Sequence, residues 1–148
     1  MSEYVSIVDD VKRMRTDGVV HCGHIEHSAS LPAVASLFSL SSDPSNYRKI
    51  AKQEAIQILT RILHKDMAYD MEIMPLEVAE GLCATFLQGF ADESTVFFTN
   101  IDYSREGKRG RNVSSGPNWN PVTKATFDAG VIAISKSRSA CLWIEDED

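Results

Sequence analysis

The chain has 148 residues, of which 43% are apolar, and a formal net charge of −6. A chain of this length buries roughly two-thirds of its unfolded surface on folding, so the sequence predicts one domain over residues 1–148 with a sizeable core. The negative charge argues against a general nucleic-acid binder, because that affinity comes largely from Lys and Arg side chains that neutralise phosphates. It favours instead a partner that has a basic surface.

The cysteines and the first residues indicate the compartment. The chain has three cysteines, Cys22, Cys83 and Cys141, which lie far apart and include no Cys-x-x-Cys pair. An odd number at this spacing argues against a disulfide framework. Residues 1–10 lack the basic and apolar regions of a signal peptide, and no stretch approaches the roughly 20 apolar residues of a membrane span. The sequence therefore predicts a soluble, cytoplasmic protein that does not act at a membrane.

Helix signals dominate the first part of the chain. Apolar residues at a spacing of three predict an amphipathic helix from Val5 to Met14. Residues 19–25 fit a strand, although a glycine within them weakens that assignment. A short helix is expected from Leu31 toward Leu40, because Ser30 can cap it and proline is tolerated in its first turn.

Two further apolar stripes predict the main helices. The wider stripe predicts a long helix from Ser45 to His64, packed on more than one side. A second stripe predicts a helix that starts at Pro75 and ends near Gly89. Residues 66–74, between the two, are compatible with part of another helix.

The hydrophobic period changes in the last third of the chain. Residues 95–99, 125–135 and 139–144 are rich in strand-forming side chains, and the last two segments are spaced as a hairpin. Helices followed by strands indicate an α+β fold, in which N-terminal helices pack against a C-terminal antiparallel sheet.

The end of the chain concentrates negative charge directly after an apolar strand. These carboxylates are either a solvated terminus or a docking surface for a basic partner, with a tryptophan as its aromatic anchor. The candidate partner-binding residues are Trp119, Asp128, Trp143, Glu145, Asp146, Glu147 and Asp148. A second negative region in the helical half is the next candidate, unless it is an ordinary solvated helix face. It comprises Asp66, Asp70, Glu72, Glu77 and Glu80.

Three of the four histidines, His21, His24 and His27, fall within seven residues of one another. Imidazole is a common zinc ligand, and Cys22 and Glu26 lie in the same segment. The spacing does not match the His-Glu-x-x-His pattern, and no Cys-x-x-Cys pair completes a structural zinc site. A zinc site is therefore an alternative to surface histidines that cluster without a role.

The run from Arg105 to Arg111 is the only dense basic segment, and its glycines indicate a loop. It lacks the order of a phosphate-binding P-loop. A solvated loop is therefore favoured over a phosphate or nucleic-acid contact.

No nucleophile, dinucleotide or kinase motif is present in the sequence, so a binding role is favoured over an enzymatic one. We expect an inhibitor or toxin-immunity protein that covers the basic active site of a nuclease or a nucleotide-consuming toxin, because carboxylates can mimic phosphate charge. The alternative is a metal-dependent enzyme or metal-binding domain that uses the segment from His21 to His27.

Overall fold

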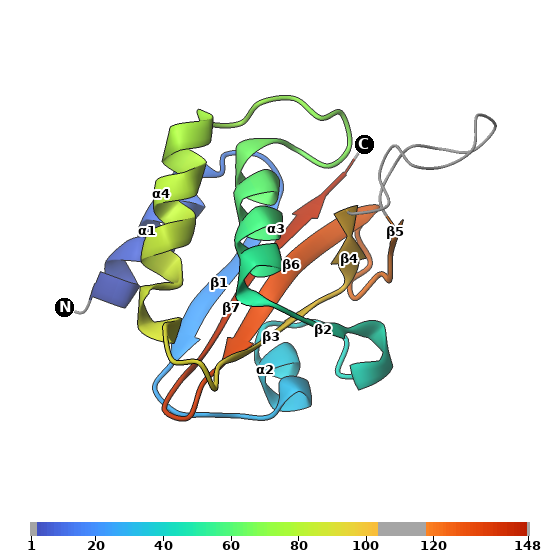
Figure 1. Cartoon of the computed structure of the whole chain (residues 1–148). Helices are drawn as coiled ribbons and strands as arrows, with labels where there is room; N and C mark the ends of the chain where they lie inside the picture. The colour runs from blue at the N-terminus through green and yellow to red at the C-terminus, as the bar shows by residue number, and fades with distance from the viewer. Residues whose placement is uncertain (1–2, 104–117, 148) are drawn as a thin grey trace.

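A computed structural model describes residues 3–103 and 118–147, and within them the chain forms four α-helices and a five-stranded antiparallel sheet. The helices belong mainly to the N-terminal half and the long strands to the C-terminal half, so the α+β prediction is confirmed (Figure 1). The helices are α1 (Glu3–Met14), α2 (Leu31–Leu37), α3 (Lys52–His64) and α4 (Leu76–Phe86). The sheet strands are β1 (Val19–Ile25), β2 (Arg48–Ile50), β3 (Val96–Thr99), β6 (Phe127–Ile134) and β7 (Ser139–Asp146).

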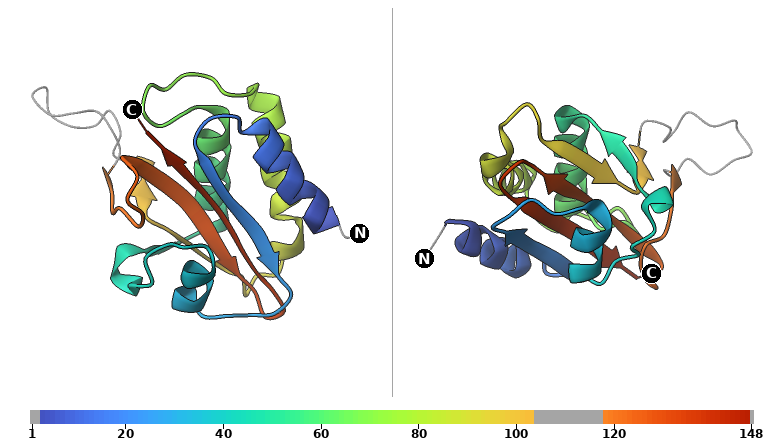
Figure 2. Two further views of the ribbon diagram at one scale, coloured as in Figure 1. Left: turned by 180° about the vertical axis from the view of Figure 1, so that it is seen from behind. Right: turned by 90° about the horizontal axis from the view of Figure 1, so that it is seen from below.

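The sheet has the order β1-β7-β6-β3-β2, so the predicted β6–β7 hairpin forms its centre. Two short strands, β4 (Ile101–Asp102) and β5 (Asn118–Trp119), pair separately. Helices α1, α3 and α4 cover one face of the large sheet, and α2 lies on the other face (Figures 1 and 2). Both faces of β6 and β7 are consequently buried, which explains their nearly continuous apolar sequence.

Two glycines allow close approaches that position buried side chains. Gly130 in β6 faces the ring of Trp143, and a Cβ atom there would lie 2.6 Å from that ring. Gly18 adopts a positive φ of 79° between α1 and β1, and a Cβ atom there would lie 2.3 Å from a carboxylate oxygen of Asp146. A larger side chain at either position therefore requires a shift of the backbone or of these buried groups.

The predicted helix from Ser45 to His64 is wrong over its first part. Asp43 instead caps a 3₁₀ turn at Pro44–Asn46, and β2 follows it before α3 begins at Lys52. Tyr47 and Ile50 mimic a helical spacing, but they belong to opposite sides of the sheet. Tyr47 packs edge-on against Trp143 in the α2 layer, whereas Ile50 joins the core under the other three helices.

Two other segments differ from the sequence-based expectation. Residues 66–74 form no α-helix, and an isolated bridge pairs Lys65 with Glu72. Helix α4 ends at Phe86, and a 3₁₀ turn at Gln88–Phe90 replaces its predicted last turn. The strand over residues 19–25 is present and pairs with β7 along its whole length.

Candidate functional site

The C-terminal strand turns one of its carboxylates inward. Asp146 is buried and accepts two hydrogen bonds from the guanidinium of Arg15, at 3.1 and 2.8 Å. Arg15, also buried, donates a further bond of 2.9 Å to the carbonyl of Ile62 in the last turn of α3. Asp146 therefore joins α1, α3 and β7 and is not exposed for docking.

Asp128 and Trp143 are buried together on the opposite side of the sheet. The indole N–H of Trp143 donates to Asp128 at 3.2 Å, and the side-chain amide of Asn100 donates to it at 2.7 Å. The backbone N–H groups of Val122 and Thr123 also donate to this carboxylate. The full burial of Trp143 excludes it as an exposed anchor, and Asp128 organises the interior instead.

The other residues of the predicted acidic site are dispersed. Glu145 is half-buried and contacts His21, while Glu147 is exposed and accepts from Thr126. Trp119 packs against Phe127 with ring centroids 5.6 Å apart. Asp148 lies outside the described residues, as does the basic run Arg105–Arg111.

The three clustered histidines do not converge. His21 and His24 point to opposite faces of β1, because His21 contacts Glu145 and His24 packs against Phe86 of α4 at 4.8 Å between ring centroids. His27 is exposed beyond the strand. Across residues 3–103 and 118–147, no group of three or more His, Cys, Asp or Glu side chains is arranged to hold a metal ion. The zinc hypothesis therefore loses its geometric basis.

The loop between α3 and α4, residues 65–75, is held in one compact shape by hydrogen bonds. Asp66 donates its N–H to Met71 at 3.0 Å, Asp70 donates back to Asp66 at 3.1 Å, and Ile73 donates to His64 at 2.7 Å. Asp70 has a φ of 56°, a left-handed conformation that Asp tolerates better than most residues. These contacts make the α3–α4 loop a closed, ordered projection between the two helices (Figure 1).

Asp146 also holds the α3–α4 loop in place. Its Oδ2 atom accepts a bond of 2.9 Å from the backbone N–H of Met67, in addition to the bonds from Arg15. The buried ion pair therefore holds the loop as well as the helices. This is the structural role of the acidic terminus that the sequence pattern did not reveal.

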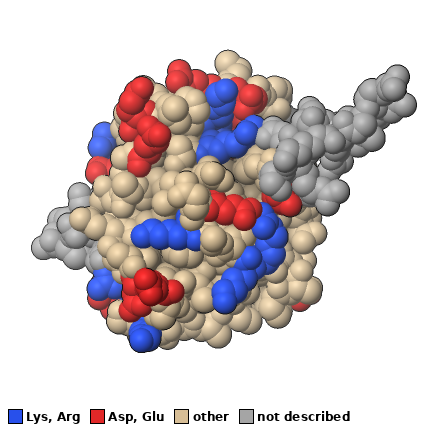
Figure 3. Space-filling model, viewed as in Figure 1, with Lys and Arg blue, Asp and Glu red and all other residues tan. Residues whose placement is uncertain are grey.

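The α3–α4 loop displays apolar side chains among carboxylates. Tyr69 is 63% exposed and Met71 is 65% exposed, and they flank Asp70 in the sequence. Acidic side chains gather over the loop and α4 beside a smaller basic group (Figure 3). The loop and α4 contain the five carboxylates of the second predicted region: Asp66, Asp70, Glu72, Glu77 and Glu80. Sequence reasoning identified these carboxylates but missed Tyr69 and Met71.

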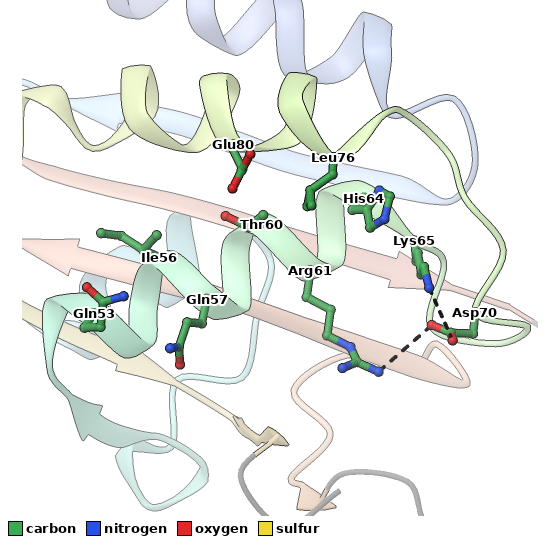
Figure 4. A pocket seen from close by; sticks show the side chains of 10 residues that line it. All are labelled: Gln53, Ile56, Gln57, Thr60, Arg61, His64, Lys65, Asp70, Leu76 and Glu80. Atoms are coloured by element: carbon green, nitrogen blue, oxygen red, sulfur yellow. Dashed lines mark ion pairs between the residues drawn. The ribbon is translucent and has the colours of Figure 1, made fainter.

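A pocket of about 560 Å³ lies beside the loop, between α3 and α4 (Figure 4). Arg61 and Lys65 direct their charged ends to the Asp70 carboxylate, at 4.0 and 3.8 Å. The guanidinium of Arg61 also lies 4.5 Å from the centroid of the Tyr103 ring. The pocket is lined by Gln53, Ile56, Gln57, Thr60, Arg61, His64, Lys65, Asp70, Leu76 and Glu80.

Comparison with protein-family models, with curated proteins and with solved structures found no match for this chain. Within the described residues, no helix has the length and apolar character needed to cross a membrane.

Proposed function

We propose that this chain is a protein-binding domain that inhibits a partner enzyme by covering its basic surface, as an immunity protein covers a toxin. The observation that carries the proposal is the exposure of Tyr69 and Met71 on an ordered loop rich in carboxylates. Tyr is enriched among the residues that dominate binding energy, and Met is enriched in interfaces. Lone exposed apolar residues are common, so their pairing on a fixed acidic loop is what supports an interface.

The charge of the α3–α4 region supports a basic partner. Its five carboxylates outnumber the two bases, Arg61 and Lys65, that line the same region. Such an excess accelerates encounter with a positive surface and disfavours partners of like charge. A nuclease or nucleotide-consuming enzyme fits this requirement, since its active site is built to hold phosphates.

The order of the loop supports tight binding. A loop that is already fixed by its own hydrogen bonds and by Asp146 loses little conformational entropy when a partner binds. We also propose that the protein acts in the reducing cytoplasm, because its three cysteines are buried and unpaired.

Affinity capture from the native lysate, with mass spectrometry of the retained proteins, tests the proposal. The bait is compared with a Tyr69→Ala/Met71→Ala variant and with Leu37→Ala, a matched control because Leu37 is 65% exposed on the distant helix α2. We expect the native chain and the control to retain one basic protein in stoichiometric amount, and the double variant to lose it. The native chain should also inhibit the activity of that protein. Equal retention by all three baits would contradict docking through the loop.

A further inference from the structure

We propose that the pocket between α3 and α4 is a binding site for a small organic molecule that carries a phosphate or carboxylate group. The anionic group would take the place that the Asp70 carboxylate now occupies between Arg61 and Lys65. This inference does not require the proposed inhibitory function, although Asp70 and Glu80 line the pocket and also belong to the acidic region of that proposal. It concerns a ligand of opposite charge to the protein partner proposed above.

The cationic end of the pocket already holds one carboxylate. Arg61 and Lys65 come from the last turn of α3 and the residue after it, so both charged ends meet at the same edge of the pocket. Asp70 reaches them from the α3–α4 loop, and its two contacts of 4.0 and 3.8 Å are at the outer limit of an ion pair. The Asp70 side chain therefore marks the position where an acidic group is attracted.

Asp70 is a counterion that a ligand can replace. Its side chain is 64% exposed, and exposed ion pairs at such distances contribute little stability. When Asp70 turns outward it is resolvated, whereas a phosphate or carboxylate that enters can form charge-assisted bonds with a guanidinium and an ammonium group. Replacement of Asp70 is therefore favourable for a ligand whose acidic group forms closer bonds with Arg61 and Lys65 than the Asp70 carboxylate does.

The rest of the pocket fits an organic body. Ile56 and Leu76 give it apolar surface from α3 and α4, and Thr60 and Gln57 offer polar groups along α3 (Figure 4). A volume of about 560 Å³ is within the range of small-molecule sites. A single inorganic ion would leave most of this space unused. The structure therefore favours an acid attached to a compact, partly apolar molecule.

Titration of ¹⁵N-labelled protein with phenyl phosphate, benzoate and benzyl alcohol tests the inference. We expect phenyl phosphate, benzoate or both to shift the amide resonances of Arg61, Lys65 and Asp70 saturably, and the uncharged alcohol to leave them unchanged. The stronger of the two acids identifies the preferred group. Shifts of equal size for the alcohol, or the absence of saturable shifts with both acids, would overturn the proposal.

Two variants separate a built site from diffuse surface binding. Arg61→Gln should abolish saturable binding, whereas Asp70→Asn should strengthen it by about two- to fivefold, because the competing charge is removed and Asn tolerates the positive φ of this position. The matched control is Asp10→Asn, which removes the carboxylate that lies 2.9 Å from Arg13 on α1. The affinity of this control should equal that of the native chain. Weaker or unchanged binding by Asp70→Asn would contradict the exchange.

Discussion

Arg15 and Asp146, 131 residues apart in the chain, form a buried two-point ion pair that joins α1, the end of α3, the last strand and the α3–α4 loop. The guanidinium and the carboxylate satisfy each other and also bond to backbone groups, as buried charges require. The proposed docking loop is thus fixed by a contact that lies beneath it, and its stability and its function can be tested separately.

Loss of either partner of this ion pair should destabilise the whole fold. Arg15→Met leaves the Asp146 carboxylate buried without its counterion, and we expect the free energy of unfolding to fall by about 3–5 kcal/mol. Urea unfolding measures this change. The exposed pair of Arg13 and Asp10 offers a matched control, since Arg13→Met should cost only about 0–1 kcal/mol. Similar losses for the two variants would contradict the structural role of the buried pair.

Asp128 should be equally important on the other side of the sheet. Asp128→Ala strands the indole N–H of Trp143 and the backbone N–H of Val122, and each stranded buried donor costs about 1–3 kcal/mol. We expect a loss of about 3 kcal/mol or more in urea unfolding followed by tryptophan fluorescence. The exposed Asp9 provides the comparison, because Asp9→Ala should leave the transition nearly unchanged. Coincident transitions of the two variants would show that Asp128 has no organising role.

The cysteines should be unreactive while the protein is folded. Burial raises the pKa of Cys22 from 9.0 to about 12 and that of Cys83 to about 11, so little thiolate is present near neutral pH. Because an unfolded thiol ionises above pH 9 and the folded thiol of Cys22 does not, the free energy of unfolding should decrease as pH rises from 9 toward 12. Thiol labelling with and without urea checks the first expectation, and urea titrations across this pH range check the second. Rapid labelling of the folded chain would contradict the burial of these groups.

The strength of the sequence signal differed between elements. The β6–β7 hairpin was predictable because both strands are apolar and a short polar turn joins them. The start of α3 was not predictable, because Tyr47 and Ile50 have a helical spacing but pack into two different hydrophobic cores. Only the pairing of β2 with β3, which is remote in sequence, shows that the chain is extended there.

The candidate site was harder to predict than the fold. In a strand that continues to residue 146, side chains alternate between faces, so Asp146 is directed inward although its neighbours are acidic. Its partner Arg15 is too distant in the chain for any local pattern to indicate it. The available signal for the docking loop was the sequence Tyr69-Asp70-Met71-Glu72, where apolar and acidic residues alternate between two amphipathic helices. The pattern alone does not indicate a docking loop, because the exposure of both apolar side chains is visible only in the structure.

Binding through the α3–α4 loop should also depend on charge. Neutralising Asp66, Glu72 and Glu77 together by amides should slow association with the partner and reduce its sensitivity to salt, because charges at the rim of an interface act mainly on encounter. Association rates measured by surface plasmon resonance at several salt concentrations test this expectation. Glu147→Gln, an exposed change at the C-terminal end, is the control and should retain the native salt dependence. An unchanged salt dependence in the triple variant would remove these carboxylates from the interface.

The most direct test of the proposed docking loop is the equilibrium affinity of the captured partner for the native chain, for Tyr69→Ala/Met71→Ala and for Leu37→Ala, each first shown to unfold at the native urea midpoint. The proposal predicts that the double variant binds at least about tenfold more weakly, as loss of interface anchors does, and that Leu37→Ala binds like the native chain. Native affinity in the double variant would contradict docking through Tyr69 and Met71.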